Sequence, residues 1–347
     1  MNKNLKFLSL LFAILTIVSD ENLYAQNDTN SGDHEFTMFL IRSGGNIDWE
    51  SPSTLYDTVL KTSLKAVLNS KKDMHIFGHA VMVMTSPLLG SDTIWLGVNS
   101  DSKTRQEVDL VLKEKMGLGA LGVSFPAKLE GRDRILTDIR NNNLYTEVKF
   151  VKFLLSDESA KQIIEFHDYY HKSYKDSYEA PSYYYGVQFW PLYEGEGAAC
   201  SSICLASLES GGIFMSDELQ NEWMVKLKIP INLVGGRFRN NEKIKVSKVK
   251  KTKSWYEGDG VPNEDYIDFE LYDVNYMLDW VNREINDENR FVYMLRDDLH
   301  IDGLQFDFRD VKPHLPLEDI IRERKDPSPF VTNHLENLVT LPQQVTD

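Results

Sequence analysis

The sequence predicts an α+β fold, and three observations along the chain support this class. The apolar runs MHIFGHAVMVM and TIWLGVNS are separated by the turn-like TSPLLGSD, which is typical of two antiparallel strands in a hairpin. The run TEVKFVKFLL alternates as a strand does, and SDESAKQIIEFHDYYHKSY follows it with acids at its start and lysines near its end, as in a capped helix. Between Ser53 and Leu68, apolar residues recur at helical spacing behind Ser53 as N-cap.

The N-terminus has the features of a secretory signal peptide over residues 1–25. Lys3 and Lys6 precede an apolar run from Phe7 to Ser19, and a polar stretch then ends at Ala25. The run holds 13 residues, fewer than the roughly 20 that a membrane-spanning helix needs, and no later segment is long and apolar enough. No cysteine lies near Ala25 to carry a lipid anchor. We therefore expect an exported protein, periplasmic or secreted, with no integral membrane segment after cleavage.

Residues 26–35 are polar and predict a flexible lead-in to a core domain over residues 36–215. The core begins with a strand, FTMFLI, and continues with the elements described above. A glycine-rich break at Gly117–Gly122 and the aromatic stretch PSYYYGVQFWPLYEGEG follow in the chain. The last core helix starts at Cys200 and ends near Gly211 and Gly212, because glycine commonly terminates helices.

Residues 216–347 form a C-terminal extension with a different pattern. The runs KLKIPINLV and EKIKVSKVKK predict strands, and FELYDVNYMLDWVNREI predicts a further strand and a helix. The acidic segment EGDGVPNEDYID lacks the ligand spacing of an EF-hand and is interpreted as a solvated loop. The extension either completes the first sheet or forms a small appended domain, and both alternatives stay open.

The composition excludes one class of partner. The chain has 38 Lys and Arg against 53 Asp and Glu, which gives a formal net charge of −15. Binding to nucleic-acid phosphates requires the opposite sign, so we expect no nucleic-acid partner. A hydrophobic content of 42% with 11% aromatic residues is typical of a globular chain.

The two cysteines have different surroundings, although they lie four residues apart. That spacing places Cys200 and Cys204 on one helix face, where the geometry does not suit a disulfide. Cys200 is at the helix start, where backbone N–H groups and the helix dipole stabilise a thiolate. Cys204 lies one turn deeper and is interpreted as a core residue. Cys200 is therefore the candidate nucleophile.

A thiolate nucleophile needs an imidazole to carry its proton and a third group to orient the ring. The best placed of the 8 histidines is His79, in FGHAVMVM, where Gly78 and Ala80 leave space around it. A histidine in such an apolar strand either has a buried hydrogen-bond partner or acts as a base. Its pairing with Cys200 favours the second interpretation.

The order of these elements resembles the circularly permuted branch of the NlpC/P60 papain-like superfamily. The resemblance covers roughly Met74 to Gly212 and rests on a strand with Gly-His-Ala, a second strand, a later strand and helix, and Gly-x-x-Cys at a helix start. It implies a permuted papain-like antiparallel sheet packed against helices. Ser201 and Ser202 fit the polar residues that often follow the family's cysteine, whereas Ala199 replaces the usual Asn or Asp before it.

The resemblance also implies a third catalytic residue on the strand after His79. If Met84 pairs near Thr93, His79 lies opposite Val98, and a register shifted by one residue brings Asn99 beside it. We therefore expect Asn99 to orient the ring. The N–H of Cys200 is the expected oxyanion donor, with Gln188 or Tyr185 adding a side-chain donor or lining the substrate site.

The sequence does not favour a metal site. His75 and His79 are four residues apart, but on a strand they are separated by about 13 Å at about 3.3 Å per residue, which one metal cannot bridge. The chain has no HExxH and no CxxC motif, so we expect no metal and no cofactor. The tyrosines and Trp190 upstream of Cys200 either line a substrate groove or form an aromatic packing cluster.

The resemblance implies an exported cysteine-dependent hydrolase or acyltransferase that acts on an amide or ester. The expected substrate is a small molecule, a peptidoglycan peptide or a lipid acyl group. A second hypothesis belongs to another class of function, a non-catalytic periplasmic or surface binding protein that retains the papain-like fold. Ala199 favours this alternative, since it departs from the family's pattern.

Overall fold

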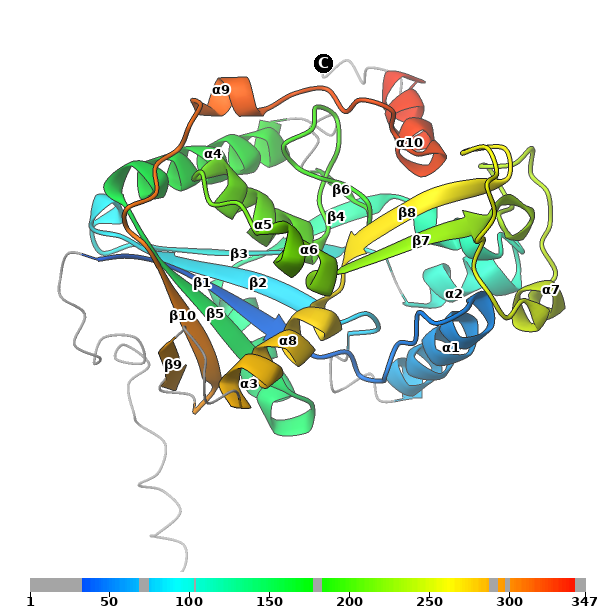
Figure 1. Ribbon diagram of the computed structural model, residues 1–347, viewed down its shortest axis with the longest axis horizontal. Helices are drawn as coiled ribbons and strands as arrows, with labels where there is room; N and C mark the ends of the chain where they lie inside the picture. Colours follow the sequence, from blue (N-terminus) through cyan, green and yellow to red (C-terminus); the bar gives the residue numbers. More distant parts are fainter. Residues whose placement is uncertain are drawn as a thin grey trace, which may run out of the picture.

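The computed structural model describes residues 33–68, 75–102, 104–176, 183–286, 293–296 and 300–340. The predicted signal peptide, residues 1–25, lies outside the described residues. The predicted α+β class is confirmed, since a mixed sheet is packed between helices (Figure 1). In the described part of the chain, none of the helices combines the length and the apolar character that crossing a bilayer requires.

Within the described ranges, the main sheet has 8 strands in the order β6-β4-β3-β2-β1-β5-β10-β9. Only β5 and β10 run parallel, and every other neighbouring pair is antiparallel. The predicted hairpin is confirmed as β2 and β3. The strands are β1 (His34–Ile41), β2 (His79–Thr85), β3 (Thr93–Ser100), β4 (Phe125–Glu130), β5 (Val148–Leu155), β6 (Tyr184–Tyr185), β9 (Tyr293–Arg296) and β10 (Asp302–Phe308).

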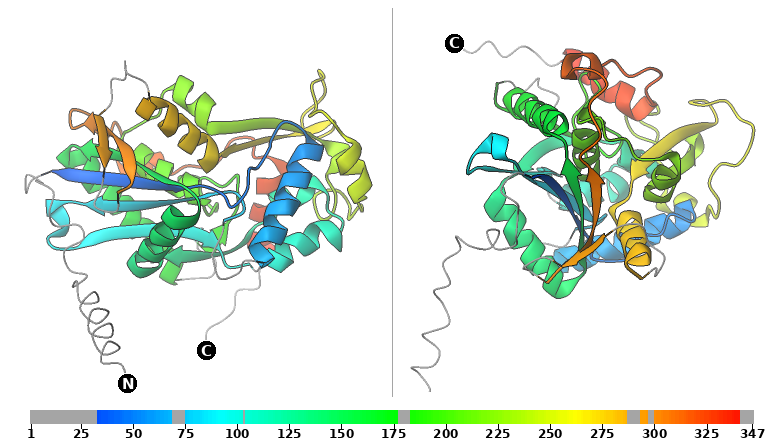
Figure 2. Two further views of the ribbon diagram at one scale, coloured as in Figure 1. Left: turned by 90° about the horizontal axis from the view of Figure 1, so that it is seen from below. Right: turned by 60° about the vertical axis from the view of Figure 1, so that its left-hand side comes forward.

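Helices cover both faces of this sheet, which explains why its central strands are almost continuously apolar. α4 (Asp157–Asp176), α5 (Cys200–Ser210) and α8 (Val274–Asn286) lie on one face, and α3 (Arg132–Tyr145) lies on the other (Figure 2). Successive strand residues point to opposite faces. Ala80 and Met82 therefore pack in the core with α5, while Val81 and Val83 pack with α3.

A second core lies beside the main sheet. The two-stranded sheet of β7 (Met224–Pro230) and β8 (Tyr266–Tyr272) packs there with α1 (Pro52–Leu68) and the short helix η5 (Leu118–Gly122). The remaining helices are α2 (Thr104–Leu112), α6 (Asp217–Trp223), α7 (Val246–Lys251), α9 (Leu317–Ile320) and α10 (Pro329–Thr340), with η4 (Pro87–Leu89) and η7 (Ile231–Leu233). The extension thus both adds β9 and β10 to the main sheet and builds a separate small sheet.

Several predicted boundaries need correction. The run EKIKVSKVKK, predicted as a strand, contains helix α7. The lead-in expected to reach residue 35 ends earlier, because β1 starts at His34. The strand expected from Met74 starts at His79, and residues 75–78 form a bend before it. Helices α2 and α3 and strand β4 were not predicted, and all three contribute to the site described below.

Candidate active site

Cys200 is the first residue of α5, as the sequence predicts. Its neighbour Ala199 has no side-chain acceptor to cap the helix, which leaves N-terminal N–H groups for other partners. The backbone N–H groups of Ala80 and Ser201 point to the sulfur. Burial raises the pKa of the thiol, but the His79 imidazole and these two N–H groups outweigh burial, and the net pKa of Cys200 is lowered. The start of α5 therefore favours the thiolate.

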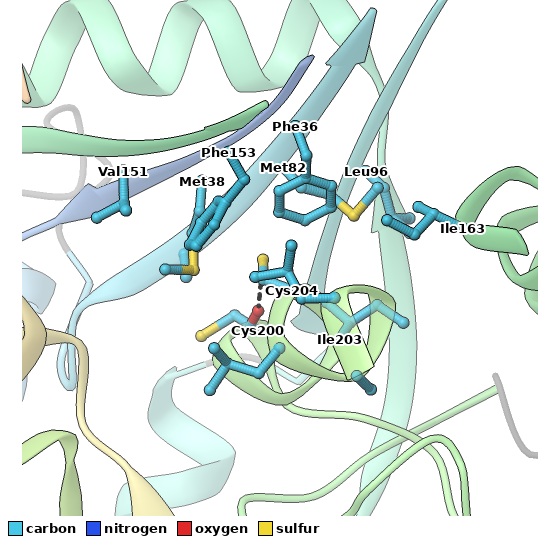
Figure 3. Packing of buried hydrophobic residues seen from close by; sticks show 14 of the residues in the cluster. Phe36, Met38, Met82, Leu96, Val151, Phe153, Ile163, Cys200, Ile203 and Cys204 are labelled. Atoms are coloured by element: carbon cyan, nitrogen blue, oxygen red, sulfur yellow. Dashed lines mark hydrogen bonds between the residues drawn. The ribbon is translucent and has the colours of Figure 1, made fainter. Parts of the chain in front are cut away.

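Cys204 contrasts with Cys200, since it has the core position that the sequence predicts. It is fully buried, and its thiol donates to the carbonyl of Cys200 at 3.3 Å. Figure 3 shows Cys204 directed at the sheet residues Phe36 and Met82, while the sulfur of Cys200 points aside. Burial raises the pKa of the Cys204 thiol well above its usual value, and the nearby Cys200 adds to this. The two thiols are thus chemically different and form no disulfide.

His79 opens strand β2 and contacts both Cys200 and a carboxylate. Its Nε2 lies 2.6 Å from Oε2 of Glu130 on β4. Burial lowers the pKa of the imidazole, but hydrogen bonding to Cys200 and to Glu130 outweighs burial, and the pKa is raised well above its usual value. Because Glu130 occupies Nε2, Nδ1 is the nitrogen left to face the sulfur. Sulfur, imidazole and carboxylate therefore follow one another in the order that a nucleophile, a base and an orienting group would take.

The carboxylate in contact with His79 belongs to Glu130, whereas the predicted partner, Asn99, bonds within its own strand. Extending the observed register, Val81 opposite Gly97, by two residues places Asn99 across from His79, but its Oδ1 accepts the N–H of Ser100 at 2.9 Å. Gly97 lies between His79 and Glu130 in the sheet and pairs with Glu130. A Cβ at this glycine would come within 2.7 Å of Oε2 of Glu130. The bare backbone therefore lets the carboxylate reach across β3.

The electrostatics of Glu130 match an orienting role. Burial raises the pKa of this carboxyl, but the hydrogen bond and charge of His79, with smaller effects of His75 and Arg134, lower it to about 2. A carboxylate that stays ionised can stabilise an imidazolium next to it. The sequence offered two signals for this residue, a glycine inside a strand and an acid ending the run FPAKLE.

Of the two predicted donors, the structure brings only Tyr185 to the thiol. Burial and the neighbouring Cys200, to which it is hydrogen-bonded, raise the pKa of the Tyr185 phenol well above its usual value. Gln188 is engaged elsewhere, since its Nε2 donates to the carbonyl of Asp268 at 3.4 Å and its Oε1 accepts from Ser328 at 2.9 Å. Residues of the aromatic stretch also pack against other parts of the chain. For example, the ring centroids of Trp190 and Tyr272 lie 5.7 Å apart.

A cavity of about 820 Å³ opens beside these residues. His79, Glu130, Tyr185 and Asn99 are among the residues that line it. Its walls are largely apolar and come from α1, α2 and η5: Leu55, Val59, Leu60, Val108, Val111, Leu118 and Leu121. Cys200 lies directly behind His79 and Tyr185 and is 7% exposed, whereas His79 is 2% exposed. Cys200 itself does not line the cavity.

A second histidine lies on the face of His79, which corrects the expected separation of about 13 Å. The rings of His75 and His79 stack with centroids 4.4 Å apart and an interplanar angle of 18°. Gly78, at φ +84°, turns the chain so that His75 is not part of the strand. Nε2 of His75 lies 2.7 Å from Oδ2 of Asp138 on α3. The site thus holds two imidazole–carboxylate pairs.

No protein-family model matches the chain, and searches of curated proteins and of solved structures return no significant match.

Proposed function

We propose that this chain is an exported cysteine-dependent hydrolase or acyltransferase with a permuted papain-like core of the NlpC/P60 type. The observation that carries the proposal is the series Cys200, His79 and Glu130 at the N-terminus of a helix, next to a large cavity. The antiparallel neighbours of β2, with α5 packed on them, fit the expected core. The substrate would be an amide or an ester.

The reaction begins with transfer of the thiol proton of Cys200 to His79. The sulfur attacks the carbonyl carbon and forms a C–S bond, while the carbonyl electron pair moves to oxygen. Backbone N–H groups at the start of α5, including that of Cys200, supply donors for this oxyanion. Collapse of the intermediate breaks the bond to the leaving group, which takes the proton from His79. Water or an acceptor alcohol or amine then attacks the thioester, and His79 accepts and returns a proton in the same way.

The cavity walls support an apolar acyl group as the part of the substrate that is bound. Side chains from α1, α2 and η5 present leucine and valine to the cavity. Burial of a methylene group in such walls contributes about 0.8 kcal/mol. We therefore expect hydrolysis of p-nitrophenyl esters to favour octanoate over acetate in kcat/KM, and a muropeptide to be a poorer substrate.

Alkylation of the native chain with iodoacetamide at neutral pH tests the nucleophile. We expect one thiol to react, and mass spectrometry of peptides to locate it at Cys200. Cys204→Ser is the matched control and should react normally, whereas Cys200→Ser should not react. His79→Ala should slow alkylation by about 100-fold, the lower end of what a general base contributes. Alkylation that is equally fast in wild type and His79→Ala would remove the basis of the mechanism.

A second candidate function is a binding protein that retains the fold without catalysis. The observation that favours it is the 7% exposure of Cys200, which lies behind the side chains that line the cavity. In that case the cavity alone is functional. A thiol that reacts only after denaturation, together with binding of a fatty acid by the native chain, would support this second candidate.

A further inference from the structure

Four side chains near the active site form a cluster with the donor set of a metal centre. His75, His79 and Asp138 each offer one ligand atom, and these atoms all lie within 4.8 Å of one another. Glu130 adjoins them, 2.6 Å from Nε2 of His79. The set, called the imidazole–carboxylate cluster below, comprises His75, His79, Glu130 and Asp138.

The fold holds the cluster together from both sides. A Cβ at Gly78 would come 3.1 Å from the carbonyl oxygen of Ile41 and 3.2 Å from Val274, at a φ that disfavours other residues. This turn places His75 over His79. On the other side, Nδ2 of Asn142 donates to Oδ1 of Asp138 at 2.8 Å, which leaves Oδ2 directed at His75. Such a partner behind a carboxylate is what orients metal ligands.

The spacing suits a small divalent ion. Tetrahedral zinc with bonds of about 2.0–2.1 Å places its ligand atoms about 3.3 Å apart. The two closest pairs of ligand atoms, His79 with Glu130 at 2.6 Å and His75 with Asp138 at 2.7 Å, would move slightly apart. The ligand atoms that lie farthest apart, within 4.8 Å of one another, would move closer together. The proposed site requires side-chain rotations that make both changes.

The charge of the cluster and its access from the cavity also favour a bound divalent cation. The two carboxylates bring two negative charges into a buried place, with side-chain exposures of 3% and 1%. A divalent ion balances them when both imidazoles are neutral, and imidazole with carboxylate suits zinc and similar transition metals. Arg134 lies 3.5 Å from Glu130 and adds one opposing positive charge. His75, His79 and Glu130 line the cavity, which provides the path for entry.

We propose that the imidazole–carboxylate cluster binds one divalent transition-metal ion, of which zinc is the best fit. The proposal concerns binding and does not depend on the proposed catalytic function. It has a consequence for the thiol, because a ring whose Nε2 lone pair is on the metal keeps a proton on Nδ1. Such a ring has no lone pair left to take the proton of Cys200. Metal binding would therefore slow alkylation of Cys200.

Calorimetric titration of the mature chain with Zn²⁺, and the visible absorption of added Co²⁺, test the site directly. We expect one ion per chain. His75→Gln and Asp138→Asn should each weaken binding more than about 100-fold, beyond the effect of losing an outer partner. Two variants guard against misfolding, since His75 lies outside strand β2 and the Asp138 change keeps the side-chain shape. The matched control changes His167 and His171 on α4, another stacked histidine pair with centroids 5.2 Å apart, and should leave binding unchanged.

The outcomes separate this cluster from a site made by the thiol. Binding that survives in Cys200→Ser, without a thiolate-to-cobalt charge-transfer band in wild type, supports the proposal. Zn²⁺ that slows iodoacetamide in wild type but not in His75→Gln supports its consequence. Binding that is lost in Cys200→Ser and retained in His75→Gln would assign the ion to the sulfur and overturn the proposal. So would the absence of Zn²⁺ binding, whatever the enzyme's activity.

Discussion

At position 97 the sheet needs a residue without a side chain. Its Cβ would lie 2.7 Å from Glu130 and 2.9 Å from Val81, and β strands on both sides prevent the backbone from moving away. We expect Gly97→Ala to push Glu130 off His79 and to slow both turnover and alkylation of Cys200 at least tenfold, on the order of one lost charged hydrogen bond. Pre-steady-state labelling with iodoacetamide measures the effect.

Gly131→Ala is the matched control, because a Cβ there meets nothing within 4 Å although the residue directly follows Glu130. This variant should keep the wild-type labelling rate. Equal rates in both variants would show that Glu130 has no influence on His79 and Cys200.

The positions of Cys200 and His79 stand out in the local sequence, but the contact between His79 and Glu130 could not be predicted. Cys200 follows glycines at a helix start, and His79 interrupts an apolar strand, so each stands out within a few residues of chain. Glu130 matters only because β4 pairs with β3 and because Gly97 leaves a gap between them. Strand pairing between distant segments leaves no local pattern, which is why Asn99 was preferred. The predicted distance between His75 and His79 was wrong for a similar reason. The positive φ of Gly78 turns the chain there, and no pattern in the neighbouring residues indicates this turn.

At the scale of elements, prediction depended on apolar periodicity. It succeeded for α1, α4, α5 and the central strands, where one face or both are buried. It missed α3, because two residues of the buried face of this helix, Asp138 and Asn142, are polar and interrupt the helical spacing of apolar residues. It misassigned α7, because Ile244 and Val246 alternate as in a strand, although the chain is helical from Val246 and Val249 is the buried residue of that helix.

Helix α10 provides a pH-dependent contact with the loop before Cys200. Nε2 of His334 donates to the carbonyl of Gly195 at 3.1 Å, and its ring lies 4.4 Å from that of Phe189. Burial lowers the pKa of His334 to about 4, and the hydrogen bond to Gly195 offsets this only in part. The unfolded chain therefore takes up this proton near pH 6.5, while the folded chain resists protonation until about pH 4.

We expect the free energy of unfolding to fall as the pH drops from 6.5 to about 4, by on the order of 3 kcal/mol from this residue. Carboxylates contribute to the pH dependence of wild type as well. The comparison with His334→Gln isolates the histidine, since the variant should lose less stability over this window. Urea unfolding at several pH values measures the difference, and parallel curves for the two proteins would contradict the assignment.

At the scale of the whole molecule, the C-terminal extension is part of the main core rather than an addition to it. β10 pairs with β5 in the sheet, and Met277, Leu278 and Leu304 belong to the same buried cluster as Cys200. The last segment passes from β10 over α4 to α10 (Figure 1). On this path Arg324 binds Glu196, which is fully buried, at 2.6 and 2.8 Å. The extension thereby also fixes the loop that leads to Cys200.

This arrangement predicts that a chain ending at residue 215, the boundary expected for the core, does not fold. It would expose the face of β1 and β5 that α8 covers, leave β5 without its parallel neighbour, and remove Arg324 from Glu196. Because a domain is typically stable by only about 5–15 kcal/mol, we expect these losses together to prevent folding. Urea unfolding followed by tryptophan fluorescence should show no cooperative transition. A chain ending at Thr340, which keeps all of α10, is the matched control and should unfold cooperatively; a cooperative transition in the shorter chain, with a reactive Cys200, would restore the core as an independent domain.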